Sequence, residues 1–409
     1  MDSGNIAWLL TSASLVLLMT PGLAFFYGGM SRGKSVLNMM MMSFGAIAVG
    51  AVAWALVGNS ISVGDSIGGL FGDPSTDFLL SSSFVSGDGE SLIATGFGAT
   101  FAIITVALIS GSVADRMKFS AWMVFAFLWV ILVYSPVSHW VWGGGILAEG
   151  GGIFTADWFP QDFAGGTVVH INAGVAGLVM ALLLGVRKGF GKEPMRPHNL
   201  PFVMLGAALL WFGWFGFNAG SAFAADDAAA AAWVNTTTAT AAAILGWLLV
   251  EKLRDGKATS LGAASGVVAG LVAITPAAVA VDPWGALLIG VFAGVLSSLA
   301  VGLKYKFGYD DSLDVVGVHL VAGLWGTVAI GLFGTTTFGA WDGVFTGGDL
   351  GGLWAQIVAA GVTIAYSAVA TLIIGLVLKF TIGLRVSEEV EVSGIDLAEH
   401  GETAYEEAK

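Results

Sequence analysis

Cysteine is absent from this 409-residue chain, and charged residues make up only 11% of it. Without cysteine there is no disulfide, no thiolate metal site and no cysteine nucleophile. Soluble domains typically contain about 25% charged and about 45–50% apolar residues, whereas 56% of this chain is hydrophobic. The 16 Lys and Arg residues are scattered along the chain, so no basic nucleic-acid surface is expected. These shortages exclude an ordinary soluble domain and leave a polytopic membrane protein.

A membrane-spanning helix needs about 20 mostly apolar residues, and eleven stretches of the chain meet that requirement. They cover residues 6–29, 36–58, 92–112, 119–140, 164–185, 200–222, 231–250, 260–280, 285–303, 315–334 and 353–378. The predicted fold class is therefore an all-α polytopic membrane protein. No basic region precedes the first apolar run, so we interpret it as a retained span rather than a signal peptide.

Positive charge is confined to one side of this predicted topology. All 16 Lys and Arg residues lie in the connections 30–35, 113–118, 186–199, 251–259 and 304–314 or after residue 378. The positive-inside rule then predicts an N-terminus outside the cell membrane and a C-terminus in the cytoplasm. The opposite connections contain only acidic charges. They predict an outer rim that mildly favours cations, although the solubility of loops explains them equally well.

An internal repeat surrounds two histidines. Residues 169–177 and 318–326 both read V-H-x-x-A-G-x-x-G, with His170 in the fifth predicted span and His319 in the tenth. The two copies are five spans apart, so they cross the membrane in opposite directions. This is typical of inverted-repeat transporters, whose substrate path lies between the halves near the midplane. We predict two five-span halves, about 6–185 and 200–334, then a last long helix at 353–378, and a tail at 379–409.

Histidine at membrane depth is unfavourable and marks a functional site by default. The Ala and Gly residues after His170 and His319 leave each helix a smooth face, which allows close approach of the helices and contact between the imidazoles. We predict that the pair lines a pore. Two core histidines that satisfy each other are the alternative, whereas a metal site lacks a third ligand at suitable spacing. No nucleophile and base appear together, so we expect neither an enzyme nor a cofactor.

Aromatic and hydroxyl residues meet at the predicted outer face. Trp142 ends the fourth span and Ser221 the sixth, with Phe217 one turn below Ser221. Phe97 and Phe101 share a face of the third span. A cation at this rim would stack on the Trp142 indole and donate a hydrogen bond to the Ser221 hydroxyl. Because Trp residues in membrane proteins mostly serve as interfacial anchors, position alone does not assign Trp142 to the substrate.

Asp162 stands just before the fifth span. This position predicts an N-cap that accepts backbone N–H groups at the positive end of the helix dipole. Direct acceptance of a proton from the substrate is the alternative role.

Several segments resemble the signature of the ammonium transporter family (Amt/MEP, related to the Rh proteins). They are DFAGGTVVHINAGVAGLVMALLLGVR at 162–187, PHNLP at 197–201, WFGWFGFNAGSA at 211–222, DVVGVHLVAGLWG at 314–326 and GLRVSEEVEVSGIDLAEHGETAY at 383–405. The matches follow the family's order, so the resemblance extends over essentially the whole chain.

The resemblance implies a role for each candidate residue. The implied roles are a recruitment site at Trp142, Ser221 and Phe101, a gate at Phe101 and Phe217, a proton relay at His170 and His319 in a hydrophobic pore, and an acidic residue near the recruitment site at Asp162. The presence of Trp142 and Ser221 favours the Amt branch over the Rh branch.

The resemblance also implies ammonium as substrate, with methylammonium as an analogue, and a homotrimer with one pore per subunit. It implies a PII-type nitrogen regulatory protein as partner of a regulatory tail. An ammonium sensor and an Rh-like channel for ammonia or carbon dioxide are the alternative functions. Whether protons follow the histidines, which would make uptake electrogenic, or only ammonia passes is left open.

Overall fold

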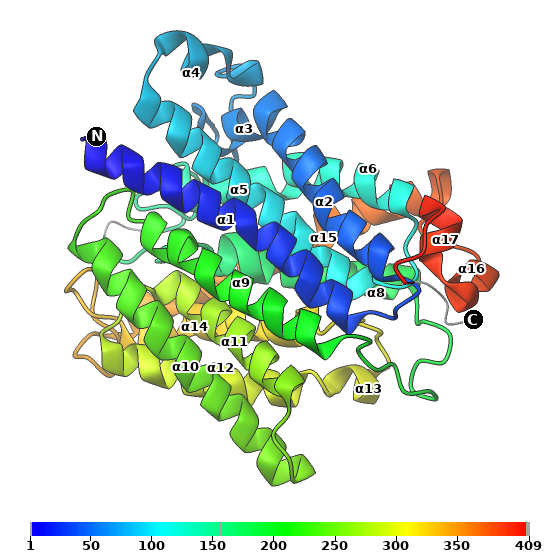
Figure 1. Ribbon diagram of the computed structural model, residues 1–409. Coiled ribbons are helices and arrows are strands. Elements are labelled where there is room, and N and C mark those ends of the chain that lie inside the picture. Colours follow the sequence, from blue (N-terminus) through cyan, green and yellow to red (C-terminus); the bar gives the residue numbers. More distant parts are fainter. Residues whose placement is uncertain (1, 155–156, 406–409) are drawn as a thin grey trace.

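The computed structural model describes residues 2–154 and 157–405, and within them eleven helical segments are long and apolar enough to span a membrane. Figure 1 shows these segments as one bundle, with the N-terminal end of α1 and the tail helices α16 and α17 at opposite ends. We call the end that carries the chain's N-terminus the N-face and the opposite end the C-face. The predicted all-α membrane fold is confirmed.

Five of the spans are single helices. They are α1 (Ser3–Met30), α5 (Gly89–Val113), α9 (Leu200–Gly220), α10 (Asp227–Asp255) and α15 (Leu350–Thr381). The other six are interrupted by a change of helix type or a break. They are α2–η1–α3 (Val36–Ala53, Trp54–Gly58, Asn59–Val63), α6–η3–α7 (Phe119–Trp129, Val130–Tyr134, Ser135–Trp142), η4–α8 (Gly166–Ile171, Asn172–Leu184), α11–η5 (Ser260–Ile274, Thr275–Ala277), α12–α13 (Pro283–Ala300, Leu303–Phe307) and η6–α14 (Val316–Leu320, Val321–Phe333).

The predicted spans fall on these helices, but several helices extend further. We predicted 231–250 for the seventh span, whereas α10 begins at Asp227, where the side chain of Asp226 accepts a hydrogen bond from the Ala229 amide. α15 likewise begins before residue 353, next to its N-cap Asp349. Hydropathy detects only the apolar centre of a helix, whereas polar caps and terminal turns lengthen it at both ends.

The two halves are arranged as an inverted repeat. The first span of each half, α1 and α9, lie side by side (Figure 1), and a Cβ atom at Gly206 would collide with the Phe26 amide nitrogen. In one half, the Phe163 amide donates to the Pro276 carbonyl in η5, at 3.1 Å. In the other half, the Leu313 amide donates to the Gly111 carbonyl near the end of α5, at 3.0 Å. The fifth span of each half thus begins against the third span of the other half.

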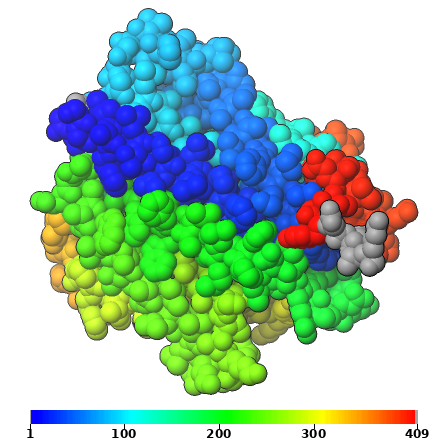
Figure 2. All heavy atoms as spheres, in the orientation of Figure 1, coloured from blue at the N-terminus to red at the C-terminus, as the bar shows by residue number. Residues whose placement is uncertain are grey.

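Short elements cover both faces. A loop at the N-face holds β1 (Ser66–Ile67), β2 (Phe71–Gly72), η2 (Phe78–Leu80) and α4 (Ser81–Ser86), and the tail at the C-face holds α16 (Glu388–Ser393) and α17 (Ile395–His400). The tail is docked onto the bundle (Figure 2). The Asp396 carboxylate accepts hydrogen bonds from the Leu37 and Asn38 amides in the first turn of α2, at 3.0 and 2.8 Å.

Candidate functional site

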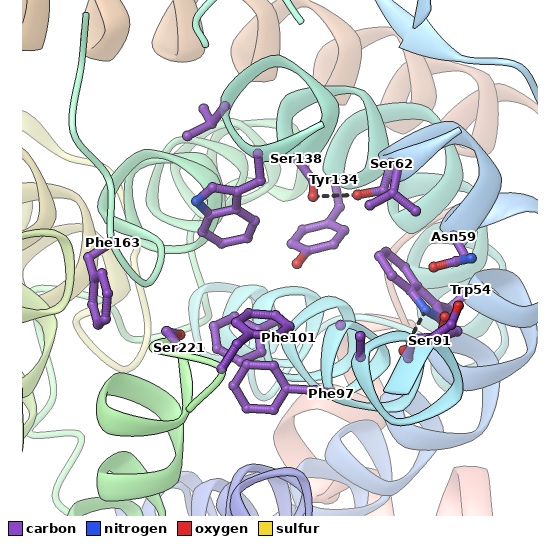
Figure 3. Close-up of a pocket in the computed structure, with 17 residues that line it drawn as sticks. Trp54, Asn59, Ser62, Ser91, Phe97, Phe101, Tyr134, Ser138, Phe163 and Ser221 are labelled. Carbon is purple, nitrogen blue, oxygen red and sulfur yellow. Dashed lines mark hydrogen bonds between the residues drawn. The ribbon is translucent and has the colours of Figure 1, made fainter. Parts of the chain in front are cut away.

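A cavity of about 610 Å³ opens among the N-face ends of several spans (Figure 3). Its lining combines aromatic rings with hydroxyl and amide groups. Among the lining residues are Trp54, Asn59, Phe101, Tyr134, Trp142 and Ser221. Three of these, Phe101, Trp142 and Ser221, were predicted from the sequence to lie together, and the fold places all three on this cavity. Trp54, Asn59 and Tyr134 were not predicted.

Hydrogen bonds fix the orientation of Trp142 and Ser221 at this cavity. The Trp142 indole nitrogen donates to the Asp162 carbonyl oxygen at 2.8 Å, which fixes the position of the ring. The Ser221 hydroxyl donates to the Phe217 carbonyl oxygen at 2.8 Å. Because its proton is used in that bond, the Ser221 oxygen presents lone pairs to any N–H donor in the cavity.

Two phenyl rings separate this cavity from the centre of the bundle. Phe101 and Phe217 are stacked, with ring centroids 4.1 Å apart and planes 21° from parallel, and both are buried. Phe101 also meets the edge of Trp142 at 6.1 Å, and Phe217 lies 6.2 Å from the His170 ring on the other side. A molecule that leaves the cavity in this direction must displace or slip past the stack.

His170 and His319 form a pair behind the stack. Their Nδ1 atoms are 3.3 Å apart, and their exposed fractions are 1% and 2%. A bond between two imidazole nitrogens requires one ring to donate and the other to accept, so the two neutral rings share one proton. The Nε2 atom of His170 has no hydrogen-bond partner among the described residues. Trp214, which we did not predict, stacks on His170 at 5.5 Å.

Small residues of the repeat allow this contact. A Cβ atom on Gly174 would lie 2.6 Å from the backbone nitrogen of Leu320, and a Cβ atom on Gly323 would lie 2.8 Å from the Cβ of His170. Each histidine also lies in a π-helical turn, η4 or η6. Such turns are rare and concentrate at functional sites.

Asp162 is bound entirely within its own helix start. Its carboxylate accepts hydrogen bonds from the Gly165 and Thr167 amides, at 2.7 and 2.8 Å, and from the Thr167 hydroxyl. Asp311 does the same for the tenth span, accepting from the Val315 and Val316 amides at 3.1 and 2.7 Å. Sequence reasoning missed Asp311, although each aspartate stands eight positions before its histidine.

Buried charges cluster at the C-face. Arg187, at the end of the fifth span, pairs with Asp310 at 2.8 Å and with Asp115 at 3.3 Å. Counting charges by side predicted on which face these residues lie but not that they pair. No group of three His, Cys, Asp or Glu side chains suited to a metal ion occurs in the described part of the chain.

Comparison with known proteins identifies the family of this chain. Residues 7–405 match the Ammonium Transporter Family. The chain belongs to that family. It is 55% identical to an ammonium transporter of Mycobacterium tuberculosis, over 99% of this chain and 91% of that protein. It is 46% identical to the ammonium transporter of Bacillus subtilis over the full length of both.

Solved structures of the family share the fold. Saccharomyces cerevisiae Mep2 is 32% identical and superposes with a TM-score of 0.86, covering 100% of this chain and 93% of the Mep2 chain. A structure named Sensor Amt Protein is 27% identical, with a TM-score of 0.88, covering 97% of this chain and 98% of that one. The family resemblance read from the sequence is thereby confirmed, and this multi-pass membrane protein is a transporter by family.

Proposed function

We propose that this transporter takes up ammonium across the cell membrane by separating it into ammonia and a proton. The cavity at Trp142 and Ser221 recruits the ammonium ion, and ammonia alone passes the Phe101–Phe217 stack. The proton follows along His170 and His319, which makes uptake electrogenic. The observation that carries this proposal is the buried, mutually hydrogen-bonded imidazole pair directly behind the phenyl stack.

The exclusion of water from the apolar region beyond Phe217 provides the selectivity in this scheme. Potassium and ammonium have similar size and charge, and only ammonium can lose a proton. A permanent ion that enters the apolar region beyond Phe217 loses its hydration, and the penalty is several kcal/mol even after relaxation. Each 1.4 kcal/mol lowers passage about tenfold. Neutral ammonia avoids this penalty, so deprotonation at the stack separates the two cations.

The histidine pair moves the proton in three balanced steps. With the shared hydrogen on His170 Nδ1, the lone pair of His170 Nε2 accepts the proton that ammonium releases at the phenyl stack, because the His170 ring lies against the inner side of Phe217. The Nδ1 hydrogen then passes to His319 Nδ1 across the 3.3 Å contact. His319 finally releases its own Nε2 hydrogen toward the C-face, so one proton enters and one leaves. Asp162 is not the acceptor in this scheme, because its carboxylate is occupied by its helix start.

Orientation, assembly and partners are also proposals. The N-face is the outer side, because every Lys and Arg lies at the C-face end of a span, in a connection at the C-face or in the tail. The family resemblance supports a homotrimer and a PII-type regulatory protein that binds at the C-face, where the tail is docked. Apart from the transfer of one proton, the proposed cycle changes no bond of the substrate, and it uses neither a cofactor nor a nucleic acid.

Replacing either imidazole tests the relay. In proteoliposomes, His170→Leu and His319→Leu should abolish the ammonium-dependent current. His198→Gln is the matched control, because His198 contacts Ser31 and Tyr405 at the C-face, away from the pair, and should keep the current. A current of normal size and selectivity in both leucine variants contradicts the relay.

The same recording separates the alternatives. Because one solved relative is named a sensor, a sensing role deserves a direct comparison: a sensor would bind ammonium with little flux of any kind. An Rh-like gas channel would move ammonia without current. Simultaneous measurement of methylammonium uptake and charge in wild-type protein distinguishes these outcomes from electrogenic transport.

A further inference from the structure

The wall of the cavity opposite Ser221 carries a second set of polar and aromatic groups. In Figure 3, Trp54, Asn59 and Ser91 lie on one side of the cavity, and Phe163 and Ser221 lie on the other. The proposed recruitment site uses only the wall with Ser221. The second span, α2–η1–α3, supplies Trp54 and Asn59 to the wall opposite Ser221. Trp54 is the first residue of the π-helical turn η1, which ends at Gly58, and Asn59 follows directly.

Asn59 presents an unused acceptor to this cavity. Its side chain is 4% exposed, and its amide nitrogen Nδ2 donates to the Asp77 carboxylate at 3.4 Å. Its carbonyl oxygen Oδ1 makes no hydrogen bond with any described residue and points into the cavity (Figure 3). An amide oxygen that opens onto a cavity can accept a hydrogen bond from water or from a ligand there.

Asp77 fixes which end of the amide faces the cavity. Its carboxylate accepts hydrogen bonds from the amide and hydroxyl of Ser82, at 2.9 and 2.7 Å, and from the amide and hydroxyl of Ser83. Burial alone would raise the pKa of Asp77, but these hydrogen bonds from Ser83 and Ser82 outweigh it and hold the pKa below its ordinary value. An ionised carboxylate only accepts, so Asn59 must turn its NH₂ group toward Asp77 and its oxygen toward the cavity.

The same span carries an aromatic ring, that of Trp54, five residues before Asn59. Trp54 belongs to the same span as Asn59, is 3% exposed and lines the cavity. Its indole nitrogen donates to the Thr95 carbonyl at 3.1 Å, which holds the ring in place. An indole face and a carbonyl oxygen together suit a cation that carries N–H donors.

We propose that Asn59 Oδ1 and Trp54 form a second cation subsite in the 610 Å³ cavity, which we call the vestibule. This subsite binds ammonium or a primary alkylammonium ion before the ion reaches the phenyl stack. This proposal rests on the proposed function, because it concerns the same substrate and the same cavity. A water-sized occupant takes up about 30 Å³, so a cavity of about 610 Å³ has room for an ion at each wall together with water. Asp77 acts as a positioning residue for the Asn59 amide.

The concentration dependence of ammonium currents in proteoliposomes tests this subsite. Asn59→Leu keeps the size of the side chain and removes the acceptor, and it should raise KM about tenfold, which corresponds to about 1.4 kcal/mol. Maximal current should stay within about twofold of the wild type. Ser62→Ala is the matched control, because Ser62 lines the same cavity but its hydroxyl is already bonded to Ser138 at 2.6 Å, and its KM should not change.

The KM values of single and double variants test the role of Asp77. Asp77→Asn lets the Asn59 amide turn either way, so it should raise KM about threefold. In the double variant Asn59→Leu/Asp77→Asn the two effects should not add, since the acceptor that Asp77 positions is already gone. Additive effects would show that Asp77 acts only through the structure of the loop.

The outcomes separate this proposal from the proposed function. Unchanged KM in Asn59→Leu, with wild-type current, refutes the second subsite and leaves the transport scheme intact. A fall in maximal current without a change in KM assigns Asn59 a structural role and also refutes the subsite. Absence of ammonium current in the wild-type protein refutes the transport scheme instead. In that case, binding of methylammonium to the purified protein, measured by calorimetry, reports on the subsite. A Kd about tenfold higher in Asn59→Leu supports it, and an unchanged Kd refutes it.

Discussion

Gly323→Ala should separate the two imidazoles without touching either of them. The added Cβ would lie 2.8 Å from the Cβ of His170, whereas nine in ten real Cβ contacts are longer than 3.4 Å. The two helices must therefore move apart locally by about 0.6 Å, at a cost of about 1–3 kcal/mol for overpacking. The Nδ1 atoms of His170 and His319 start at 3.3 Å. A retreat along the line between them would lengthen the contact to about 3.9 Å, beyond the range of a hydrogen bond.

The expected result is a loss of at least about 90% of the ammonium-dependent current in proteoliposomes, with a folded protein. Gly361→Ala is the matched control, because Gly361 lies within α15 and an added Cβ there would meet no atom within 4 Å. That variant should keep its current and gain up to about 1 kcal/mol of stability from the better helix former. If Gly323→Ala conducts as well as Gly361→Ala, the close contact of the imidazoles is not required, and the relay argument fails.

Two further predictions concern the vestibule and the C-face. Trp142→Leu and Ser221→Ala should each raise KM for ammonium, about tenfold for the indole, and lower maximal flux less; an unchanged KM in concentration series would count against the cation site. Burial alone would raise the pKa of Asp310, but the Arg187 guanidinium outweighs it and lowers the pKa. The stabilisation from this pair is therefore present above the ordinary carboxyl pKa of about 4 and lost as the pH falls through the lower folded value. Thermal unfolding in detergent should show Asp310→Asn as less stable than wild type at pH 7, with a difference that shrinks below about pH 4; a constant difference would refute the assignment.

The sequence predicted the spans and the histidine pair because both depend on strong, periodic signals. Long apolar runs have no other stable location than the membrane, and a repeat five spans apart fixes the direction of its two copies. The spacing of Asp162 from His170 also recurs at Asp311 and His319, so the second cap was open to prediction from the same repeat.

The far wall of the vestibule was beyond prediction. Asn59 meets Asp77 through an irregular loop, in which neither hydropathy nor period constrains the path of the chain. Tyr134 lies in the π-helical turn η3, and such a turn rotates the side chains that follow it relative to an ideal helix.

Composition alone does not predict how the tail packs, for a similar reason. An acidic run is typical of a solvated surface, yet Glu391 and Asp396 are 1% and 2% exposed. Glu391 is bonded to Arg385, and Asp396 to the amides at the start of α2. A list of charges does not reveal which backbone amides are available, because that depends on where the helices begin in space.

The two aspartate caps explain how an inverted repeat brings its histidines to one depth. Each carboxylate binds the amides of the first turn and so determines where its helix begins. The histidine follows eight positions later in each copy, inside the π-helical turn that begins at Gly166 or Val316. A start shifted by one residue would turn the imidazole by about 100° and move it by about 1.5 Å. Because the two caps approach from opposite faces and have equal spacing from their histidines, the two Nδ1 atoms meet. The Asp162 carboxylate is bound by the amides of its helix start, so it has no free lone pair directed at the substrate.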